Sequence, residues 1–556
     1  DNFNDSPDWI ELYNTGGAAV NLTGFHLSDR VNNPTKWVIP NINIPANGYV
    51  RFWASGRDVV VGTNYHTNFK LTQSEGPETI VFADASGAII DSVTIKKHQQ
   101  GHSRGRTSDG AATWSIFTTG TPNAANNNPY SDYATKPTLS VPPGFYGGPQ
   151  NVTITSPDPN ITIRYTTNGD EPTAGSTAYS GPVNIATTTV LKARAFSSTA
   201  SILPSFQETN TYFINVAHTI PVVSISSTQV DNLILGNAGL DGCFTYLEYF
   251  DKNGNFIEEV GGSADHHGND SWAGSAHKGI DYVVRDEMGY ADEIDVPLFK
   301  VTPRSKYKRI ILKTGASDGY PGYHPNRACH LRDAYIQSLS QRAHMDLDSR
   351  SFEWVQLFVN GQYWGLYDMR EKVMDPDYTD FYYNQEEKDL DFLSFWGGLQ
   401  VRYGSAAPWN NTYNFIMNND MTVPANYAQA ADMISVTSVI DYYILNTFAV
   451  NSDWINWNSM WWQGNKAPKT KWRYTNWDMD NTFDLGENFS GWQTTGFNSS
   501  PCDLDDNFAN SGPNMGHLAI FNKLKTNPDF KDLFVNRYSE LLNSYLNCTF
   551  ALAFLD

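Results

Sequence analysis

At about residue 217 the hydrophobic pattern of this chain changes, and that change limits the folds it can adopt. Upstream, apolar and polar residues alternate in short runs such as Trp9–Asn14 and Tyr49–Trp53, with Gly, Asn and Pro between them. This alternation predicts half-buried strands, and the frequent turn residues are typical of β-sandwiches. Downstream, apolar residues recur at three- and four-residue spacing, as in Val436–Phe448, which predicts amphipathic helices. We therefore expect an all-β part followed by an α+β part.

The boundaries of the expected domains follow from composition. A chain of 556 residues is too long for one hydrophobic core, so several domains are expected. Residues 125–137 are rich in Asn and Pro and read as a linker. They separate a first β-sandwich at 1–124 from a second at 138–216, where Asn168-Gly169 is a hairpin turn signal. Residues 217–556 are predicted to form the α+β domain.

The predicted α+β domain places a hairpin between two helices. The alternating run Trp354–Tyr367 carries Asn360-Gly361 at its centre, which is a strong hairpin signal. A helical pattern precedes this run at Leu331–Leu339, and another follows it at Val436–Phe448. A polar loop, a strand at Lys471–Thr475 and an acidic cluster come next. This order of elements is typical of a two-lobed domain.

The charge of the chain excludes one class of partner. The formal net charge is −21, and no basic stripe is present to neutralise phosphates, so nucleic acid is not an expected partner. Acidity usually serves solubility alone, and a basic protein substrate is the alternative reading. No apolar run is long enough to span a membrane, so no membrane span is expected.

The cysteines and the chain ends leave alternatives open. Cys243, Cys329, Cys502 and Cys548 fit no metal-binding or redox spacing. Two disulfides in an oxidising compartment and free buried thiols are both compatible with them. Because the chain lacks an initial Met and ends in an apolar stretch, we interpret it as a processed or partial chain.

A polar loop follows the helix that ends near Val450. It runs from Asn451 to Asn458 and places Asn458 five residues after Asp453. Enzymes that transfer the γ-phosphoryl group of ATP use this spacing: the Asp orients the attacking hydroxyl and the Asn binds a metal. Asn451-Ser452 stand where protein kinases carry His-Arg. Taken alone, the same spacing also occurs in polar turns, which Asp and Asn favour.

An acidic cluster follows the next predicted strand, Lys471–Trp477. Asp478 would end that strand, and a continuing strand would place the carboxylates of Asp478 and Asp480 on one face. Such oxygen ligands suit Mg²⁺ between phosphates, and a cation offsets the repulsion between two carboxylates. A solvated acidic turn is the alternative, because Asp484 and Glu487 follow. The loop and the cluster together, with a strand between them, indicate phosphoryl transfer.

Both predicted sandwiches resemble known Ig-like modules. The first is similar to a lamin-tail domain over Asp8–Asn14, Val20–Asp29 and Ile44–Tyr49. The second is similar to the Ig-like domain at the C-terminus of chitobiases over Pro143–Pro149, Ile161–Pro172 and Thr188–Phe196. These resemblances imply spacers or binding modules. For the second module we expect a structural spacer, with a glycan contact as the alternative.

Residues from about 217 to the end resemble a CotH-type kinase domain, a family named for a spore-coat protein kinase. The most specific matches are Asn360–Tyr367 with Arg370-Glu371, and Trp477–Phe483 against the family's Trp-Asp-x-Asp-x-x-Phe. Further matching segments are His267–Trp272, Pro297–Phe299, Arg309–Lys313 and Leu331–Ala334. The resemblance implies an α+β, atypical protein-kinase-like, two-lobed domain. It also implies ATP with Mg²⁺ or Mn²⁺, and Ser or Thr of a protein as acceptor.

The resemblance implies catalytic and metal-binding roles in the loop and the acidic cluster. Asp453 would be the catalytic aspartate that orients the acceptor hydroxyl. Asp478 and Asn458 would hold the metal, and Asp480 would be a supporting ligand. Asp478 is preferred over Asp480 because the strand delivers it and it lies five residues before Phe483.

The resemblance also implies a nucleotide site. Lys278, which follows a Gly-containing loop, is expected to contact the α- and β-phosphates, with Lys313 as the second choice. Asp333 would pair with the lysine from a helix. Glu371 would lie where a hinge meets the adenine, or would form an ion pair with one of its basic neighbours.

The resulting hypothesis is a secreted atypical kinase that transfers the γ-phosphoryl group of ATP to Ser or Thr of a protein. The expected location is extracellular or at a cell surface, in a bacterium, and surface-layer proteins are candidate partners. The main alternative is a catalytically inactive surface, adhesion or structural protein with a kinase-like fold, because secreted chains meet little ATP. A kinase acting on glycans is a third hypothesis, based only on the chitobiase-like module.

Overall fold

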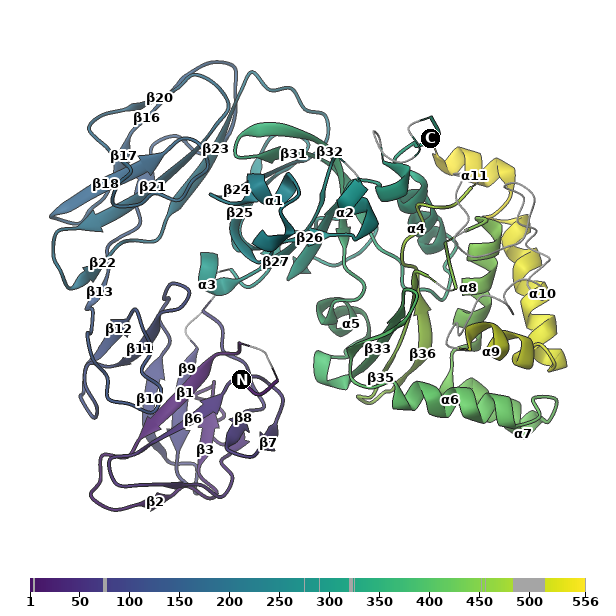
Figure 1. Ribbon diagram of the computed structural model, residues 1–556, viewed down its shortest axis with the longest axis horizontal. Helices are drawn as coiled ribbons and strands as arrows, with labels where there is room; N and C mark the ends of the chain where they lie inside the picture. The colour runs from purple at the N-terminus through teal and green to yellow at the C-terminus, as the bar shows by residue number, and fades with distance from the viewer. Residues whose placement is uncertain are drawn as a thin grey trace.

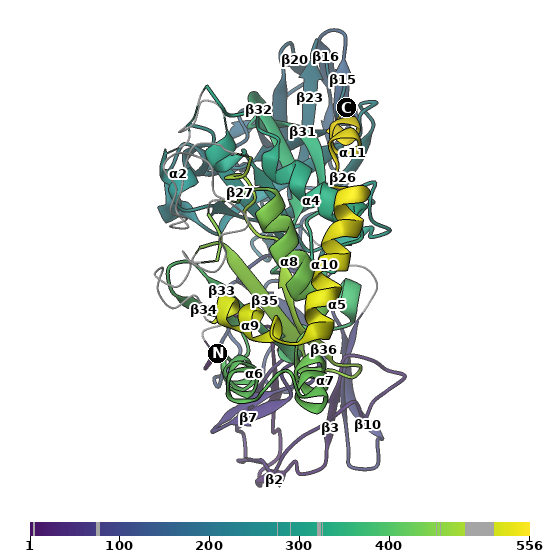
Figure 2. The same cartoon turned by 90° about the vertical axis from the view of Figure 1, so that its right-hand side faces the viewer.

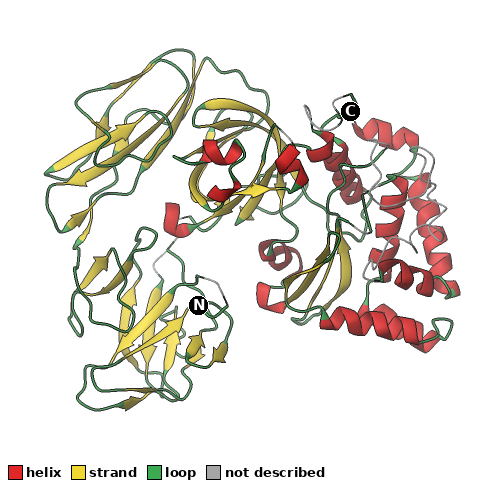
Figure 3. Cartoon of the chain, viewed as in Figure 1, coloured by secondary structure: helices red, strands yellow, loops and turns green. Residues whose placement is uncertain are grey.

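The chain forms four consecutive units that follow one another along an arc (Figure 1). The computed structural model describes residues 1–3, 6–73, 78–274, 276–289, 291–319, 324, 326–451, 453–455, 457–483 and 516–555. Two purple and blue β units lie on the left of Figure 1, a teal barrel lies in the centre, and a green and yellow helical lobe lies on the right. Strands dominate the first three units and helices gather in the fourth (Figure 3). The predicted fold class, two β-sandwiches followed by an α+β two-lobed domain, is confirmed.

The first unit is a sandwich of two sheets. The alternating run at Trp9 forms a strand that pairs antiparallel with the run at Tyr49, and Ile10 lies opposite Phe52 in the core. One sheet has the order β1 (Trp9–Tyr13), β6 (Tyr49–Trp53), β8 (Asn64–His66) and β7 (Val59–Val61). The other has the order β10 (Ile89–Thr94), β9 (Thr79–Ala83), β3 (His26–Ser28) and β4 (Trp37–Val38). Two shorter pairs complete the unit: β2 (Val20–Asn21) with β5 (Asn43–Ile44), and β11 (Ser103–Arg106) with β12 (Trp114–Phe117).

The first sandwich is open along one side. β1 and β10 are edge strands of its two sheets, and both line a cavity of about 740 Å³, together with β11. Phe25, Ile80 and Phe82, which pack against the hydrophobic core, also line this cavity. Part of the apolar interior therefore faces the space between the two edge strands.

The second unit is built on a five-stranded sheet. Its order is β15 (Gly144–Tyr146), β23 (Glu208–Ile214), β21 (Thr189–Ser197), β18 (Ile161–Thr166) and β19 (Thr177–Ala178). Facing pairs are β16 (Gln150–Val152) with β20 (Val183–Ile185), and β14 (Thr138–Leu139) with β17 (Ile154–Thr155). Within the predicted linker, β13 (Asp132–Tyr133) pairs in parallel with β22 (Ile202–Leu203). The end of that linker therefore lies on the second unit.

A closed barrel follows the second unit. Its strands run in the order β24 (Val222–Ser226), β25 (Cys243–Phe250), β26 (Phe256–His267), β27 (Gly279–Val284), β30 (Arg309–Lys313), β32 (Gln362–Glu371) and β31 (Phe352–Val359). The parallel pair β24–β31 closes it. β31 and β32 form the predicted hairpin, with Asn360 and Gly361 at φ values of 49° and 80°. Such left-handed values suit Asn-Gly and fit a tight turn that continues the twist of the strands.

Short helices and a small strand pair surround the barrel. The helices are α1 (Val230–Ile234), α2 (Asp270–Gly274) and α3 (Asp286–Gly289). The strand pair is β28 (Ile294–Asp295) with β29 (Lys306–Tyr307). One large apolar cluster fills the interior, drawn mainly from inward-facing residues of the strands, such as Ile280, Leu312 and Met369. Because side chains alternate across a strand, residues of the opposite parity face away from this interior.

The second unit packs on the barrel through buried contacts. Phe213 lies between Phe145, Phe250 and Phe358, with ring centroids 4.4 to 5.2 Å from its own. Beside these rings, the Thr211 backbone N–H donates to Oε1 of Glu248 at 2.9 Å. These contacts join strand β23 to strands of the barrel through an apolar cluster that is separate from the one inside the barrel.

The fourth unit combines a four-stranded antiparallel sheet with helices. The sheet has the order β34 (Leu399–Tyr403), β33 (Leu390–Phe395), β35 (Ser459–Gly464) and β36 (Thr470–Thr475). The helices are α4 (Arg332–Arg342), α5 (Pro376–Tyr383), α6 (Ala407–Asn418), α7 (Pro424–Met433), α8 (Val436–Phe448), α9 (His517–Leu524), α10 (Pro528–Asn543) and α11 (Cys548–Leu555). Figure 2 shows α8 and α10 side by side over this lobe. Among the described helices, none is long and apolar enough to cross a membrane.

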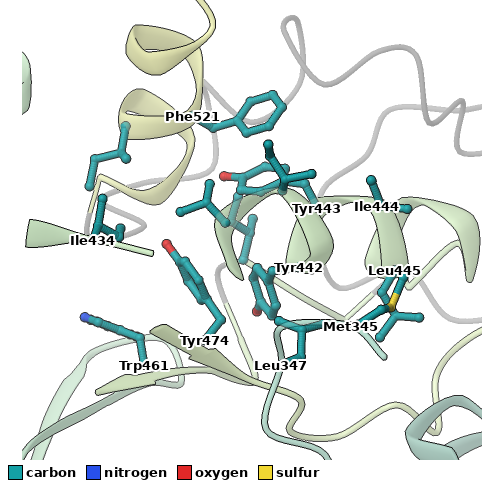
Figure 4. Close-up of a cluster of buried hydrophobic side chains, with 14 of the residues drawn as sticks. Met345, Leu347, Ile434, Tyr442, Tyr443, Ile444, Leu445, Trp461, Tyr474 and Phe521 are labelled. Carbon is teal, nitrogen blue, oxygen red and sulfur yellow. The ribbon is translucent and has the colours of Figure 1, made fainter. Parts of the chain in front are cut away.

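Helix α8 forms the centre of the helical lobe. Tyr442, Tyr443, Ile444 and Leu445 are almost completely buried, and Figure 4 shows Tyr442 beside Tyr474 of the sheet and Tyr443 beside Phe521 of α9. Tyr443 stacks on Phe521 of α9 with 4.1 Å between ring centroids. This core fixes the C-terminal end of α8, from which the polar loop emerges.

The cysteines do not form the two disulfides that were one reading of the sequence. Cys243 is a buried free thiol, and Cys329 and Cys548 are exposed free thiols. Cys502 lies outside the described residues. The two-disulfide alternative is therefore wrong.

The Glu248 carboxyl gives the contact between the second unit and the barrel a pH dependence. Its side chain is 1% exposed, and burial raises its pKa to about 7 despite the hydrogen bonds from Thr211. The folded state then holds the proton more tightly than the unfolded state. The stability contributed is complete below the ordinary pKa of 4.5 and is lost as the pH rises through about 7.

In the wild type, the free energy of unfolding should fall by up to about 3 kcal/mol between about pH 4.5 and pH 7 because of Glu248. We predict that Glu248→Gln removes this decline. Thermal unfolding across a pH series measures it. Glu353→Gln, on β31 with its carboxylate paired to Lys300, is the matched control and should keep the wild-type decline. An equally steep decline in Glu248→Gln would show that another group causes it.

Candidate functional site

Lys313 connects the barrel to the helical lobe. It is the last residue of β30, where Ile310 and Leu312 face the barrel interior, so alternation turns Lys313 to the other side. There its Nζ donates to Oδ2 of Asp333 at 2.6 Å and to Oδ1 of Asp478 at 2.5 Å. Burial would lower the pKa of Lys313, but Asp333, Asp478 and the nearby Asp480 raise it above its ordinary value. Lys313 is therefore a charged, almost buried cation.

Asp333 is the acidic centre of this arrangement. It lies in the first turn of α4, where a carboxylate is favoured by the helix dipole. Besides Lys313, Arg370 donates to it at 2.5 Å, Gln337 at 3.2 Å and the backbone N–H of Met479 at 3.2 Å. Burial alone would raise the pKa of Asp333, but the charges of Arg370 and Lys313 outweigh it and hold the pKa well below its usual range.

The acidic cluster lies on a loop beyond β36. That strand ends at Thr475, so the expectation that Asp478 ends a strand is wrong. Asp478 still reaches solvent, with 29% of its side chain exposed. Asp480 is buried, and its Oδ2 accepts a hydrogen bond from the backbone N–H of Ser317 at 2.6 Å. Burial and the charge of Asp478 raise the pKa of Asp480 well above its ordinary value.

The polar loop packs against this acidic segment. Nδ2 of Asn458 donates to Oδ2 of Asp453 at 2.8 Å, so the two predicted functional residues of the loop contact each other. Nδ2 of Asn451 lies 3.5 Å from the sulfur of Met479, between the two aspartates of the cluster. Farther along, the backbone N–H of Phe483 donates to the carbonyl of Ala449 at 2.8 Å. The loop and the cluster, separate in sequence, are therefore neighbours.

The loop has a strained backbone. Val450, Ile455 and Asn458 have φ values of 51°, 66° and 50°, in the left-handed region. This region is unfavourable for β-branched residues, and each such residue costs about 1–3 kcal/mol. Trp454 and Ile455 are fully buried, and Trp454 contacts the rings of Tyr442 and Tyr443. The hydrophobic core thus holds the loop in a conformation that strain would otherwise oppose, as is common at functional sites.

Lys278, the first choice for the phosphate-contacting lysine, lies elsewhere. It shares the parity of Ile280 and Tyr282, which face the barrel interior. Its Nζ donates to the carbonyl of Trp272 and lies 5.7 Å from that indole ring. The position beside Asp333 and Asp478 is taken by Lys313, the second choice, because the parity of β30 turns it outward.

Glu371 is also placed differently from its expected position at a hinge. Its carboxylate is fully buried and accepts from Arg304 at 3.1 Å and from the Tyr382 hydroxyl at 3.3 Å. Burial raises its pKa, and Arg304 offsets part of that effect. Glu371 does form an ion pair, as the alternative prediction stated. Its partner is Arg304, 67 residues away in the sequence, and not an adjacent basic residue.

Arg370 is the site residue that sequence reasoning missed. It precedes Glu371, and its guanidinium joins Asp333 to Asp368 on the same strand. Strand alternation was the signal that could have identified it, since Arg370 and Asp368 share a face of β32 that lies opposite the face of Met369. The same rule would have selected Lys313 over Lys278.

The residues of the cluster suit a hard divalent cation. In the part of the chain that the structure describes, no three His, Cys, Asp or Glu side chains gather closely enough to hold a metal by themselves. Asp478 and Asp480 nevertheless share one lysine as counter-charge, and a cation would stabilise the ionised form of buried Asp480. Asn458 uses its Nδ2 on Asp453, and its amide oxygen is the kind of ligand that Mg²⁺ and Mn²⁺ take. The donor set fits such an ion.

The architecture and the site define a kinase-like class of protein. A β lobe carries a lysine that pairs with an acidic residue of a helix, and the same lysine reaches an aspartate that follows a polar Asp–Asn loop. Kinases present their parts in this order.

Comparison with protein families gives the particular domains. The chain matches the model of CotH kinase protein over residues 326–552, and it therefore contains a CotH kinase domain. It also matches the chitobiase/beta-hexosaminidase C-terminal domain over 141–202 and the lamin tail domain over 1–97. No curated protein matches the chain. The kinase match begins after β30, so it includes the acidic cluster and the polar loop but not Lys313.

We predict that Asp333→Asn lowers the free energy of unfolding by about 3–5 kcal/mol, because it leaves Lys313 and Arg370 buried without a carboxylate between them. Urea denaturation measures this loss. Asp478→Asn is the matched control: the aspartate is partly exposed and its lysine keeps Asp333, so stability should stay near that of the wild type. Equal losses in both variants would contradict the central role of Asp333.

Proposed function

We propose that this protein is an ATP-dependent kinase that transfers the γ-phosphoryl group of ATP to a Ser or Thr hydroxyl of a protein substrate. The observation that carries the proposal is the pair of contacts made by Lys313, to Asp333 on α4 and to Asp478 on the acidic loop. A lysine of the β lobe held by an acidic helix residue and a metal-binding Asp nearby are the parts that phosphoryl transfer requires. The CotH kinase match supports the same class.

The residues divide the chemistry between them. Lys313 supplies positive charge for the phosphates, and Asp333 holds the lysine in position. Asp453 orients the acceptor hydroxyl and takes its proton as the hydroxyl oxygen bonds to the γ-phosphorus, while the bond from that phosphorus to the bridging oxygen breaks and ADP leaves. Asp478 and Asn458 would hold Mg²⁺ or Mn²⁺, with Asp480 in support. When bound, the ion neutralises charge on the phosphate oxygens.

The proposed setting is outside the cell or at its surface. The two β modules and the CotH domain are consistent with that location. Surface-layer or other secreted proteins are the proposed substrates. A glycan contact through the β modules, the alternative to a spacer role, stays a prediction. Phosphoamino-acid analysis of the product distinguishes protein hydroxyls from glycan acceptors.

We predict that Asp453→Asn lowers the rate of γ-phosphoryl transfer by about 10²- to 10⁴-fold, because the acceptor hydroxyl loses its base. Lys313→Ala should also abolish most of the transfer, because the phosphates lose their cation. Transfer of radiolabel from γ-labelled ATP, with Mn²⁺ or Mg²⁺ and general protein acceptors, measures both.

Lys278→Ala is the matched control, since this lysine interacts with Trp272 and not with the acidic cluster. It should retain transfer near the wild-type rate. Loss of transfer in Lys278→Ala with retention in Lys313→Ala would reverse the assignment of the lysine. A wild-type protein that binds no nucleotide with either metal would favour the inactive structural alternative.

A further inference from the structure

Arg350 is a buried cation beside the candidate site with no acidic partner of its own. It precedes β31 and is only 4% exposed. Its Nε has no hydrogen-bond partner, and over the described ranges no carboxylate forms an ion pair with its guanidinium. Arginine stays protonated in proteins, so this group carries its charge into the interior.

Arg304 and Arg370, the other two almost fully buried arginines, and Arg473, which is 13% exposed, are each held by two carboxylates. Arg304 pairs with Glu371 and Asp377, Arg370 with Asp333 and Asp368, and Arg473 with Asp346 and Asp348. Their charges are offset within the fold, as buried charges generally are. Arg350 therefore departs from the pattern that this fold otherwise follows.

Arg350 is tied to the site through Gln337 of α4. The backbone N–H of Arg350 donates to Oε1 of Gln337 at 3.0 Å. The Nε2 of the same glutamine donates to Asp333 at 3.2 Å and to the carbonyl of Trp477 at 2.8 Å. The Gln337 side chain thus positions the backbone of Arg350, the carboxylate of Asp333 that pairs with Lys313, and the segment that leads into Asp478.

The electrostatics of Arg350 agree with this position. Burial lowers its pKa, and the negative charges of Asp333, Asp478 and Asp281 offset that effect only in part. Lys313 is already committed to Asp333 and Asp478. Arg350 lies nearby, and the N–H groups of its guanidinium can donate to an anion.

We propose that Arg350 binds a phosphate group of the nucleotide at this site. The inference rests on the proposed function and names a residue in addition to the lysine. A guanidinium suits the task because its planar donors can contact two phosphate oxygens at once, whereas an ammonium acts as a point charge. The energetic cost of burying Arg350 without a partner is then offset when the anion binds.

Arg350→Met tests the inference first in the protein without ligand. It replaces an uncompensated charge by an apolar side chain of similar length, so the thermal midpoint should stay the same or rise. Arg370→Met is the matched control and should lower the midpoint, because it leaves Asp333 and Asp368 without this cation. A fall in Arg350→Met as large as in Arg370→Met would overturn the inference and assign Arg350 a structural role.

Ligand binding gives the second test, by calorimetry with Mg²⁺ or Mn²⁺ present. Arg350→Met should bind ATP about 10- to 100-fold more weakly than the wild type, with adenosine affinity unchanged and partial recovery in Arg350→Lys. Unchanged ATP affinity in the variant would overturn the inference while leaving the proposed function intact.

Inorganic tripolyphosphate separates the two proposals. If the wild type binds tripolyphosphate through Arg350 but does not bind ATP, the anion site stands and the kinase proposal fails. If the wild type binds neither anion, both fail.

Discussion

The buried ion pair between Lys313 and Asp333 is the interaction on which the candidate site depends. It joins the end of a barrel strand to the first turn of α4, and Lys313 extends the connection to Asp478. Arg370 adds a second cation to the same carboxylate and also contacts Asp368, so both cations bound by Asp333 have a second carboxylate in contact. A buried pair of this kind contributes little net stability compared with apolar packing, but it is costly to break. The ion pair instead fixes how the functional residues of the barrel lie relative to those of the helical lobe.

The polar loop reaches the same place by a different physical route. Val450 and Ile455 hold left-handed backbone conformations that β-branched residues avoid. The burial of Trp454 and Ile455 against the aromatic residues of α8 supplies the favourable free energy that maintains them. A rigid core and a strained loop therefore occur together, and the core described around α8 is part of what positions Asp453 and Asn458.

Local patterns in the sequence were enough to predict the elements that carry the site. Asn360-Gly361 predicted the hairpin, the spacing in Val436–Phe448 predicted α8, and the order of loop, strand and acidic cluster is confirmed. The Gly-containing loop favours Lys278 as the phosphate-contacting lysine, whereas the two-residue period of β30 favours Lys313, which the structure places beside Asp333 and Asp478. That period separates Ile310 and Leu312 from Lys313 and was present in the sequence. The partner of Glu371 could not be predicted, since Arg304 is 67 residues away and reaches it only through the folding of the barrel.

The contact between the second β unit and the barrel shows that this unit is more than a spacer. A spacer needs only its own core, yet Phe213 completes an aromatic cluster whose other members include Phe250 and Phe358 of the barrel. Glu248 of the barrel likewise has its hydrogen-bond donor on the second unit, at Thr211. Buried polar groups need partners, and at this contact each unit supplies the partner of the other. The strands that carry Lys313 and Arg370 belong to the same closed barrel as β24 and β25, and deformation at one side of a closed barrel is opposed by all its strands. The second unit therefore packs directly on the barrel that presents Lys313 and Arg370 to the candidate site.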